Sequence, residues 1–224
     1  MANKLTVVLT SGGLDSAVAA ALIRQDSALA LLHLQYGQQA EEAELRAFEV
    51  LCQYFKPAHH LAVSMGNWRG LSRSPLLRPH GDIEDAGALG PQTAGTFVPM
   101  LNASMLCAAA AWAHTLGAVH VVWGISLTNP GNYPDRADAV RLLAWQLATR
   151  SLPGGAAPSI EAPLAQYDKA AVVELARELA VPIDLTWSCL RPGPTPCQRC
   201  IGCTSRAKAL QKAYPAQPAG KTRA

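Results

Sequence analysis

The stretch Leu5-Thr6-Val7-Val8-Leu9-Thr10-Ser11-Gly12-Gly13-Leu14-Asp15-Ser16 decides the fold. Residues 5–9 are apolar and β-branched, which predicts a buried parallel strand. The two glycines that follow let the backbone turn tightly and approach an anion closely. The Ala-rich run from Asp15 to about Gln25 predicts a helix, whose first N–H groups and partial positive charge favour anion binding. This order of strand, turn and helix predicts an α/β fold whose first loop binds phosphate.

The candidate phosphate loop is made of Ser11, Gly12, Gly13, Leu14, Asp15 and Ser16. It lacks the Gly-Lys-Ser/Thr ending of kinases and GTPases. The alternative is a plain glycine turn in which Asp15 or Ser16 caps the helix. A carboxylate such as Asp15 near phosphates requires a cation, and we expect a Mg²⁺ ion that bridges them.

The rest of the chain alternates between strands and helices. Strands are expected at 28–34, 60–63 and 119–123, and helices at 41–55, 101–116, 136–149 and 168–179; residues 66–95 are expected to form a long loop. Alternation of this kind predicts a Rossmann-like, doubly wound parallel sheet, in which ligands bind at the carboxyl ends of the strands. The loops after Thr10, Leu34 and Trp123 should therefore meet at one site.

Composition narrows the classes of partner. The chain has 224 residues, of which 50% are apolar and 16% are charged, which suits one α/β domain with a small appendage. Its net charge of +3 gives no support to nucleic-acid binding. No apolar run is long enough to span a membrane, and the first residues do not resemble a signal peptide. We expect a cytoplasmic protein with neither a nucleic-acid nor a membrane partner.

Four cysteines gather near the end of the chain as Cys189, Cys197, Cys200 and Cys203. Their spacing, C-x7-C-x2-C-x2-C, suits a tetrahedral Zn²⁺ site, and four protein ligands leave no open position, so the zinc should be structural. An iron–sulfur cluster, a redox pair and free thiols are the alternatives. Cys52 and Cys107 fall on apolar helix faces and are expected in the core.

The loop Ser11 to Ser16 resembles that of the N-type ATP pyrophosphatases, which have the adenine nucleotide alpha hydrolase-like fold. Together with the cysteines, the chain resembles the 7-cyano-7-deazaguanine synthase (QueC) family from Leu9 to Ala209. The other matching pieces are Tyr36-Gly37-Gln38, Thr96-Phe97-Val98-Pro99, Asn102, Gly124, Tyr133-Pro134-Asp135, Lys169 and Leu185-Thr186-Trp187-Ser188-Cys189. The resemblance divides the chain into an ATP pyrophosphatase domain (1–185), a zinc-binding segment (186–210) and a flexible tail (211–224).

The resemblance implies a reaction. ATP would adenylate 7-carboxy-7-deazaguanine with loss of pyrophosphate, ammonia would form the amide, and a second ATP would drive dehydration to the nitrile. ATP, Mg²⁺ and Zn²⁺ are the implied cofactors, and a homodimer is the implied assembly. Asp15, Ser16 and Lys169 would be catalytic, with Gly124 joining the loop in binding the nucleotide. The alternative for Lys169 is a solvated lysine near a helix start.

Five residues are the candidate substrate contacts: Tyr36, Phe97, Asn102, Tyr133 and Asp135. Tyr133 and Phe97 could stack on a purine-like ring, as could Trp123, although core packing is the alternative for each. Asp135 could accept hydrogen bonds from the ring, or could start the next helix. Asn102 could be a helix cap instead.

The chain departs from the family pattern at Gln35, Gln39, Leu101, residues 129–132 and Arg136. Loss of an arginine at position 101 removes a cation that could pair with a carboxylate or phosphate. These changes leave open an alternative in which the activated acyl group is joined to another amine or to a protein, as in phage-defence systems. A tRNA-modifying relative such as a thiolase, and a zinc-stabilised binding module, are two further alternatives.

Overall fold

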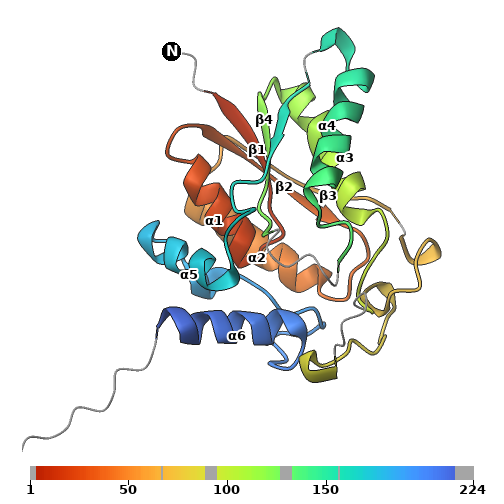
Figure 1. Cartoon of the computed structure of the whole chain (residues 1–224), viewed down its shortest axis with the longest axis vertical. Helices are drawn as coiled ribbons and strands as arrows, with labels where there is room; N and C mark the ends of the chain where they lie inside the picture. Colours follow the sequence, from red (N-terminus) through yellow and green to blue (C-terminus); the bar gives the residue numbers. More distant parts are fainter. Residues whose placement is uncertain (1–3, 67, 89–94, 127–132, 156, 215–224) are drawn as a thin grey trace, which may run out of the picture.

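The computed structural model describes residues 4–66, 68–88, 95–126, 133–155 and 157–214 (Figure 1). Within these ranges no helix combines the length and the apolar character that crossing a membrane requires.

A five-stranded parallel sheet forms the centre of the molecule, with strand order β3-β2-β1-β4-β5. The strands are β1 (Leu5–Leu9), β2 (Ala28–Gln35), β3 (His59–Ser64), β4 (His120–Trp123) and β5 (Ser159–Glu161). Strands β1 and β2 are apolar over nearly their whole length, because helices cover both of their faces. The strand order reverses between β1 and β4, and a reversal of this kind is where α/β sheets bind their ligands.

The helices lie on both faces of the sheet, which confirms the doubly wound prediction. They are α1 (Leu14–Ile23), α2 (Glu41–Phe55), α3 (Leu101–Leu116), α4 (Asp138–Ser151), α5 (Lys169–Glu178) and α6 (Ile201–Ala213). Helices α1, α2 and α5 share one hydrophobic core, and α3 shares a second core with α4. In Figure 1, α3 and α4 lie to the right of the sheet, whereas α1 and α5 lie to its left.

A third, smaller hydrophobic cluster lies around the cysteines. Leu76, Leu77 and Ile83 come from the expected loop 66–95, and they pack with Leu101 and the buried cysteines. The loop holds three short 3₁₀ turns, at Trp68–Gly70, Pro75–Leu77 and Ala86–Ala88. The described parts of this loop therefore cover the cysteine region.

Two elements escaped sequence prediction. Strand β5 has only three residues, too few for a periodic signal, and α6 begins directly after Cys200 in a region rich in cysteine and proline. Helix α4 begins at Asp138, two residues after the expected start at Arg136. Helices α2 and α3 have the predicted bounds.

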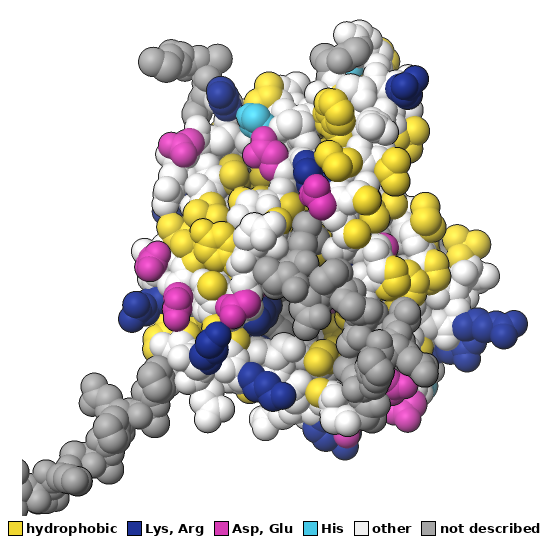
Figure 2. Space-filling model, in the orientation of Figure 1, with side chains coloured by type: hydrophobic (Ala, Val, Ile, Leu, Met, Phe, Trp, Pro, Cys, Tyr) yellow, Lys and Arg dark blue, Asp and Glu magenta, His cyan; other side chains and the backbone are white. Residues whose placement is uncertain are grey.

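One surface of the molecule is strongly apolar. Figure 2 shows hydrophobic side chains gathered at the upper right, over α3 and α4. Helix α4 exposes Leu142, Leu143, Trp145 and Leu147. Contiguous apolar surface of this kind is typical of contacts between proteins.

Gly124, which follows β4, lies directly against the start of α1. A Cβ at this position would lie 2.7 Å from Ser16 Cα and 3.0 Å from the Asp15 carbonyl oxygen. Because both neighbours are backbone, we expect Gly124→Ala to lower the free energy of unfolding by about 1–3 kcal/mol in urea titration.

Gly70→Ala is the matched control, since a Cβ at Gly70 meets no heavy atom within 4 Å. Equal stability of the two variants would contradict the proposed close packing between β4 and α1.

Candidate active site and cysteine cluster

The phosphate loop follows β1 and runs against α2. Gly12 has a φ of 80°, and a Cβ there would lie 2.6 Å from the Glu44 carbonyl oxygen, so both conformation and space require glycine. The Ser11 hydroxyl accepts a hydrogen bond from Gly13 N, whereas the Ser16 hydroxyl donates to Gly13 O at 2.9 Å. The Leu14 side chain is buried in the core, so only its backbone can face a ligand.

The first turn of α1 has no side-chain cap. Its N-cap is Gly13, which has no side chain to accept from the first N–H groups, so neither Asp15 nor Ser16 caps this helix as the glycine-turn alternative expected. Uncapped N–H groups at a helix N-terminus are donors directed at whatever lies beyond it. The loop therefore has the local geometry of an anion site.

Asp15 is paired with a cation from the chain itself. Lys169 Nζ lies 2.5 Å from Asp15 Oδ1, although the two residues are 154 positions apart. Lys169 is the first residue of α5, and Asp168 caps that helix by accepting from Ala171 N at 2.8 Å. Lys169 therefore lies at a helix start, as the alternative expected, but its ammonium group is paired beside the phosphate loop; its catalytic role stays a prediction.

His33 fixes the start of the loop from β2. Its Nδ1 lies 3.0 Å from the Thr10 carbonyl oxygen, and its ring stacks on Phe48. Burial lowers the pKa of His33, so the ring is neutral at neutral pH. Sequence reasoning missed this residue; the available signal was a histidine inside an otherwise apolar strand.

A chain of hydrogen bonds after β2 leads back to α2. The Gln38 side chain accepts from Tyr36 N at 2.9 Å and donates to Glu44 Oε2 at 2.8 Å. Burial raises the pKa of Glu44 to about 7, against the opposing effect of the Gln38 hydrogen bond. Burial and the nearby Glu44 also raise the pKa of the Tyr36 phenol. Tyr36 was a sequence candidate, but Glu44 was not.

The segment 133–136 faces Tyr36 from the other side of the site. Tyr133 Oη lies 2.7 Å from Thr96 Oγ1, and the Arg136 guanidinium lies 4.2 Å from the centre of the Tyr133 ring. Arg136 also interacts electrostatically with Tyr36. The structure thus brings the two candidate tyrosines into one region, where Arg136 interacts with both.

Asp135 binds the N-terminus of α3. Its Oδ2 accepts from Asn102 N at 3.2 Å, while its Oδ1 is buried with no hydrogen-bond partner among the described residues. Asp135 does not start α4, whose N-cap is Ala137, and Asn102 is not a cap, because Met100 is the N-cap of α3. The unpaired oxygen is therefore an acceptor that lacks a donor.

Two other aromatic candidates have different positions. Trp123 is 6% exposed and belongs to the core shared with α3, so the packing alternative is correct for it. Phe97 is half-buried beside Thr96, and its role as a substrate contact stays a prediction.

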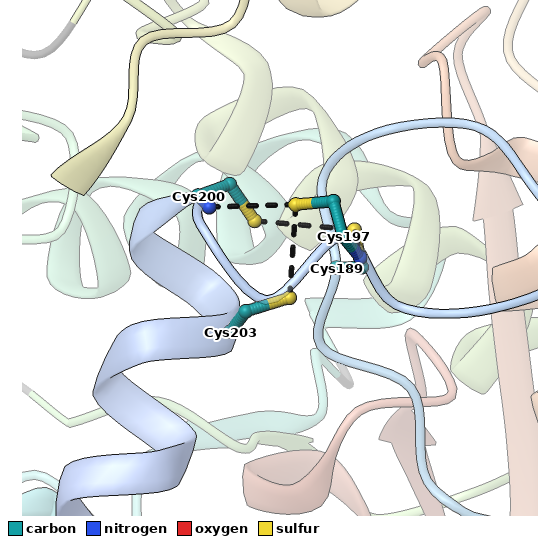
Figure 3. Close-up of side chains that lie close together, drawn as sticks. All are labelled: Cys189, Cys197, Cys200 and Cys203. Atoms are coloured by element: carbon teal, nitrogen blue, oxygen red, sulfur yellow. Dashed lines mark hydrogen bonds between the residues drawn. The ribbon is translucent and has the colours of Figure 1, made fainter.

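The four C-terminal cysteines converge, as Figure 3 shows. Their Sγ atoms all lie within 4.8 Å of one another, and the pairs Cys197–Cys203 and Cys189–Cys200 are each separated by 4.0 Å. Tetrahedral coordination with bonds of about 2.3 Å requires sulfur atoms about 3.8 Å apart, so these thiols fit a metal such as zinc.

Backbone N–H groups donate to sulfur atoms of the cluster, and burial raises the pKa of Cys189 and of Cys203. Leu190 N donates to Cys200 Sγ, and both Arg191 N and Cys197 N donate to Cys189 Sγ, at 3.3–3.4 Å. Although burial acts to raise the pKa of Cys197, N–H groups and neighbouring thiols lower it to about 6. Cys52 and Cys107 instead pack against the two large cores, as expected.

The cysteine segment contacts the phosphate loop. Trp187 N donates to the Gly12 carbonyl oxygen at 2.8 Å, and Trp187 Nε1 donates to Cys189 O at 2.8 Å. From α6, Arg206 donates to Ile183 O at 2.6 Å and to Thr186 Oγ1 at 2.6 Å. One short segment therefore connects the cysteine cluster to the residues expected to bind phosphate.

Two of the departures from the family pattern have structural roles. Gln39 Nε2 donates to the carbonyl oxygens of Pro75 and Gly81, at 2.7 and 2.8 Å. Leu101 is 8% exposed and packs in the cysteine cluster. Gln35 ends β2, and residues 129–132 lie outside the described residues.

Comparisons with known proteins agree with this geometry. A family model described as queuosine biosynthesis protein QueC matches residues 5–214. A 7-cyano-7-deazaguanine synthase of Acidobacterium capsulatum is 34% identical, covering 95% of this chain and 94% of the relative. One from a Synechococcus species is 36% identical, covering 94% and 96%.

Among solved structures, the U34-tRNA thiolase NcsA of Methanococcus maripaludis, with its [4Fe-4S] cluster, matches with a TM-score of 0.49 and 17% identity, covering 95% of this chain and 68% of the thiolase. A match at this level supports no argument about function.

The cysteine cluster generates a metal-removal prediction. We expect Cys200→Ser to abolish stoichiometric metal binding, measured by elemental analysis of the purified protein. Loss of a structural metal costs more than about 4 kcal/mol, which corresponds to a fall in Tm of about 8 °C or more at this chain length.

Cys52→Ser is the control, because Cys52 lies on α2 away from the cluster and its replacement should leave the metal content unchanged. Full metal content in Cys200→Ser would contradict the assignment of the ligands.

Proposed function

The chain belongs to the QueC family, and from this premise we propose that it converts 7-carboxy-7-deazaguanine to 7-cyano-7-deazaguanine with ATP and ammonia. The observation that carries the proposal is the uncapped N-terminus of α1 beside the Asp15–Lys169 pair. The coverage of more than nine-tenths of two synthases supports the whole reaction rather than one step of it.

In this proposal the phosphate loop binds the phosphates of ATP. The N–H groups at the start of α1 would hold the departing pyrophosphate, and Lys169 would neutralise part of its charge. A Mg²⁺ ion near Asp15 would supply further positive charge on the phosphates. The glycine at position 12 lets the loop adopt a positive φ while it packs directly against α2, which fixes the backbone from which α1 begins.

The region between Tyr36 and Tyr133 would bind the deazapurine carboxylate. A planar ring can stack on an aromatic side chain, and the buried Asp135 Oδ1 would accept a hydrogen bond from the amine or a ring N–H group. A buried acceptor without a donor costs about 1–3 kcal/mol, and a ligand that supplies the donor recovers this free energy. The proposed contact therefore favours a substrate with N–H groups on one edge.

The four cysteines would hold a structural Zn²⁺ ion. They fit the tetrahedral sulfur site that zinc prefers, and the metal would fix the segment from Trp187 to Cys189 against the phosphate loop. The ion would take no part in the chemistry, because four protein ligands leave no position for substrate.

The remaining parts of the proposal concern partners. We expect free ammonia as the nitrogen donor, a cytoplasmic location and no nucleic-acid partner. The exposed apolar side chains of α4 support the association of two copies. Joining the acyl group to another amine or to a protein is a less favoured alternative, because Gln39 and Leu101 have structural roles that explain them without a changed acceptor.

The direct test is incubation of the purified protein with ATP, Mg²⁺, ammonia and 7-carboxy-7-deazaguanine. We expect pyrophosphate release that requires the carboxylate, and a nitrile product identified by mass spectrometry. Pyrophosphate release without the carboxylate would contradict the proposal. A mass increase on the protein itself would favour the alternative acceptor.

Lys169 provides a sharper prediction about the phosphate loop. We expect Lys169→Ala to slow carboxylate-dependent pyrophosphate release by about 10²–10³-fold, because a positioned charge that stabilises the departing phosphates is lost. Measurement of pyrophosphate release under single-turnover conditions tests this.

The matched control is Lys212→Ala. This lysine contacts Asp168, the residue that precedes Lys169, but lies on the exposed surface of α6. Equal rates for the two variants would show that Lys169 is not a catalytic residue.

A further inference from the structure

We propose that Glu44 accepts the proton of the incoming amine when that amine attacks the activated carboxyl carbon. This inference rests on the proposed function and assigns a catalytic residue that sequence analysis did not single out. It depends on where α2 places Glu44, between the phosphate loop and the tyrosine region.

The position of Glu44 is fixed from both sides. Its carbonyl oxygen lies 2.6 Å from the place that a Cβ of Gly12 would occupy, so its backbone contacts the phosphate loop. Its side chain reaches toward the residues after β2, where Oε2 accepts from Gln38 Nε2 at 2.8 Å. Gln38 is 3% exposed and is itself held by Tyr36 N, so the carboxyl group has a defined orientation.

The second carboxyl oxygen is available. Oε1 of Glu44 has no hydrogen-bond partner among the described residues, and the residue is half-buried. A general base needs such an oxygen, because it must come within hydrogen-bond distance of the proton that it removes.

The surroundings of Glu44 bring the pKa of its carboxyl group close to neutral pH. Burial raises its pKa to about 7, and the negative charge of Glu41, one turn earlier on α2, acts in the same direction. From the residues after β2, the neutral Gln38 amide opposes this by donating a hydrogen bond, and Tyr36 interacts with Glu44 as a neutral phenol. Arg136 acts on Tyr36 from segment 133–136. A group with this pKa both accepts and releases a proton readily at neutral pH.

The step balances as follows. The nitrogen lone pair of ammonia forms a bond to the acyl carbon, and the bond from that carbon to the AMP oxygen breaks, with its electron pair leaving on AMP. The nitrogen then carries one proton too many for a neutral amide. Glu44 Oε1 takes this proton and becomes a neutral carboxylic acid, which later returns the proton to water.

The test separates the two half-reactions in Glu44→Gln. Without ammonia, the variant should release pyrophosphate from ATP and the carboxylate within about twofold of the wild-type rate. After ammonia is added, amide formation should be slower by about 10²–10⁴-fold, the usual contribution of a positioned base. Quenched-flow sampling with mass spectrometry measures both steps.

Glu42→Gln is the matched control, because Glu42 is on the same helix with a side chain 93% exposed. It should leave both steps unchanged. Amide formation in Glu44→Gln within twofold of wild type would overturn the inference. Loss of pyrophosphate release in Glu44→Gln alone would also overturn it, since Glu44 would then act before the amine arrives.

Failure of the proposed function is distinguishable from these outcomes, because the wild-type protein would then show no carboxylate-dependent pyrophosphate release. If Glu44→Gln does not fold, the wild-type pH profile decides. With the concentration of un-ionised ammonia held constant, the rate of amide formation should rise through a pH of about 7 as Glu44 ionises. A flat profile between pH 6 and 8 would exclude Glu44 as the base.

Thermal stability gives a third readout. Folding raises the pKa of the Glu44 carboxyl group. The group therefore stabilises the folded protein fully at a pH below the pKa that it has in the unfolded chain, and this stabilisation is lost as the pH rises through about 7. The amide of Glu44→Gln cannot ionise, so the Tm of the variant relative to wild type should be higher at pH 8 than at pH 5. An equal difference at both values would show that Glu44 is not held in the described surroundings.

Discussion

The hydrogen bond from Trp187 N to the Gly12 carbonyl oxygen is the constraint on which the site depends. Gly12 ends the turn after β1 and is confined by α2, where a side chain would collide with the Glu44 carbonyl group. Trp187 belongs to the segment that leads into Cys189 and is held by Arg206 of α6. The conformation of the phosphate loop is therefore set from both ends of the chain, and the segment that sets it also leads into the cysteine cluster.

The electrostatics of the loop follow from the same arrangement. A helix N-terminus carries about half a positive charge, which alone is a weak anion site in water. Lys169 adds an ammonium group whose charge Asp15 balances, and this pairing holds the ammonium group in place before any anion arrives. Pre-positioned charge of this kind stabilises a departing phosphate group without reorganisation at the moment of reaction.

Local features of the fold could be predicted from sequence, whereas pairings across the chain could not. Strand β1, its glycine turn and helices α2 and α3 have strong local patterns, and the cysteine spacing alone predicted a metal site. No local pattern indicates that Lys169 pairs with Asp15, or that Asp135 caps α3 instead of starting α4. Such contacts depend on which strand ends become neighbours, and the order of the strands in the sheet determines this.

Three carboxyl groups of the site have different neighbours, and these neighbours suit each group to a different role. Asp15 accepts a hydrogen bond from the Lys169 ammonium group, so it is suited to hold positive charge near phosphates. Asp135 accepts from a backbone N–H group through one oxygen, while its other oxygen is buried without a partner among the described residues. Glu44 accepts a hydrogen bond from a neutral amide, and its half-buried position disfavours its charged form, which therefore gains least from its neighbours. Of these three, Glu44 is therefore the one whose surroundings favour transfer of a proton over recognition of a charge.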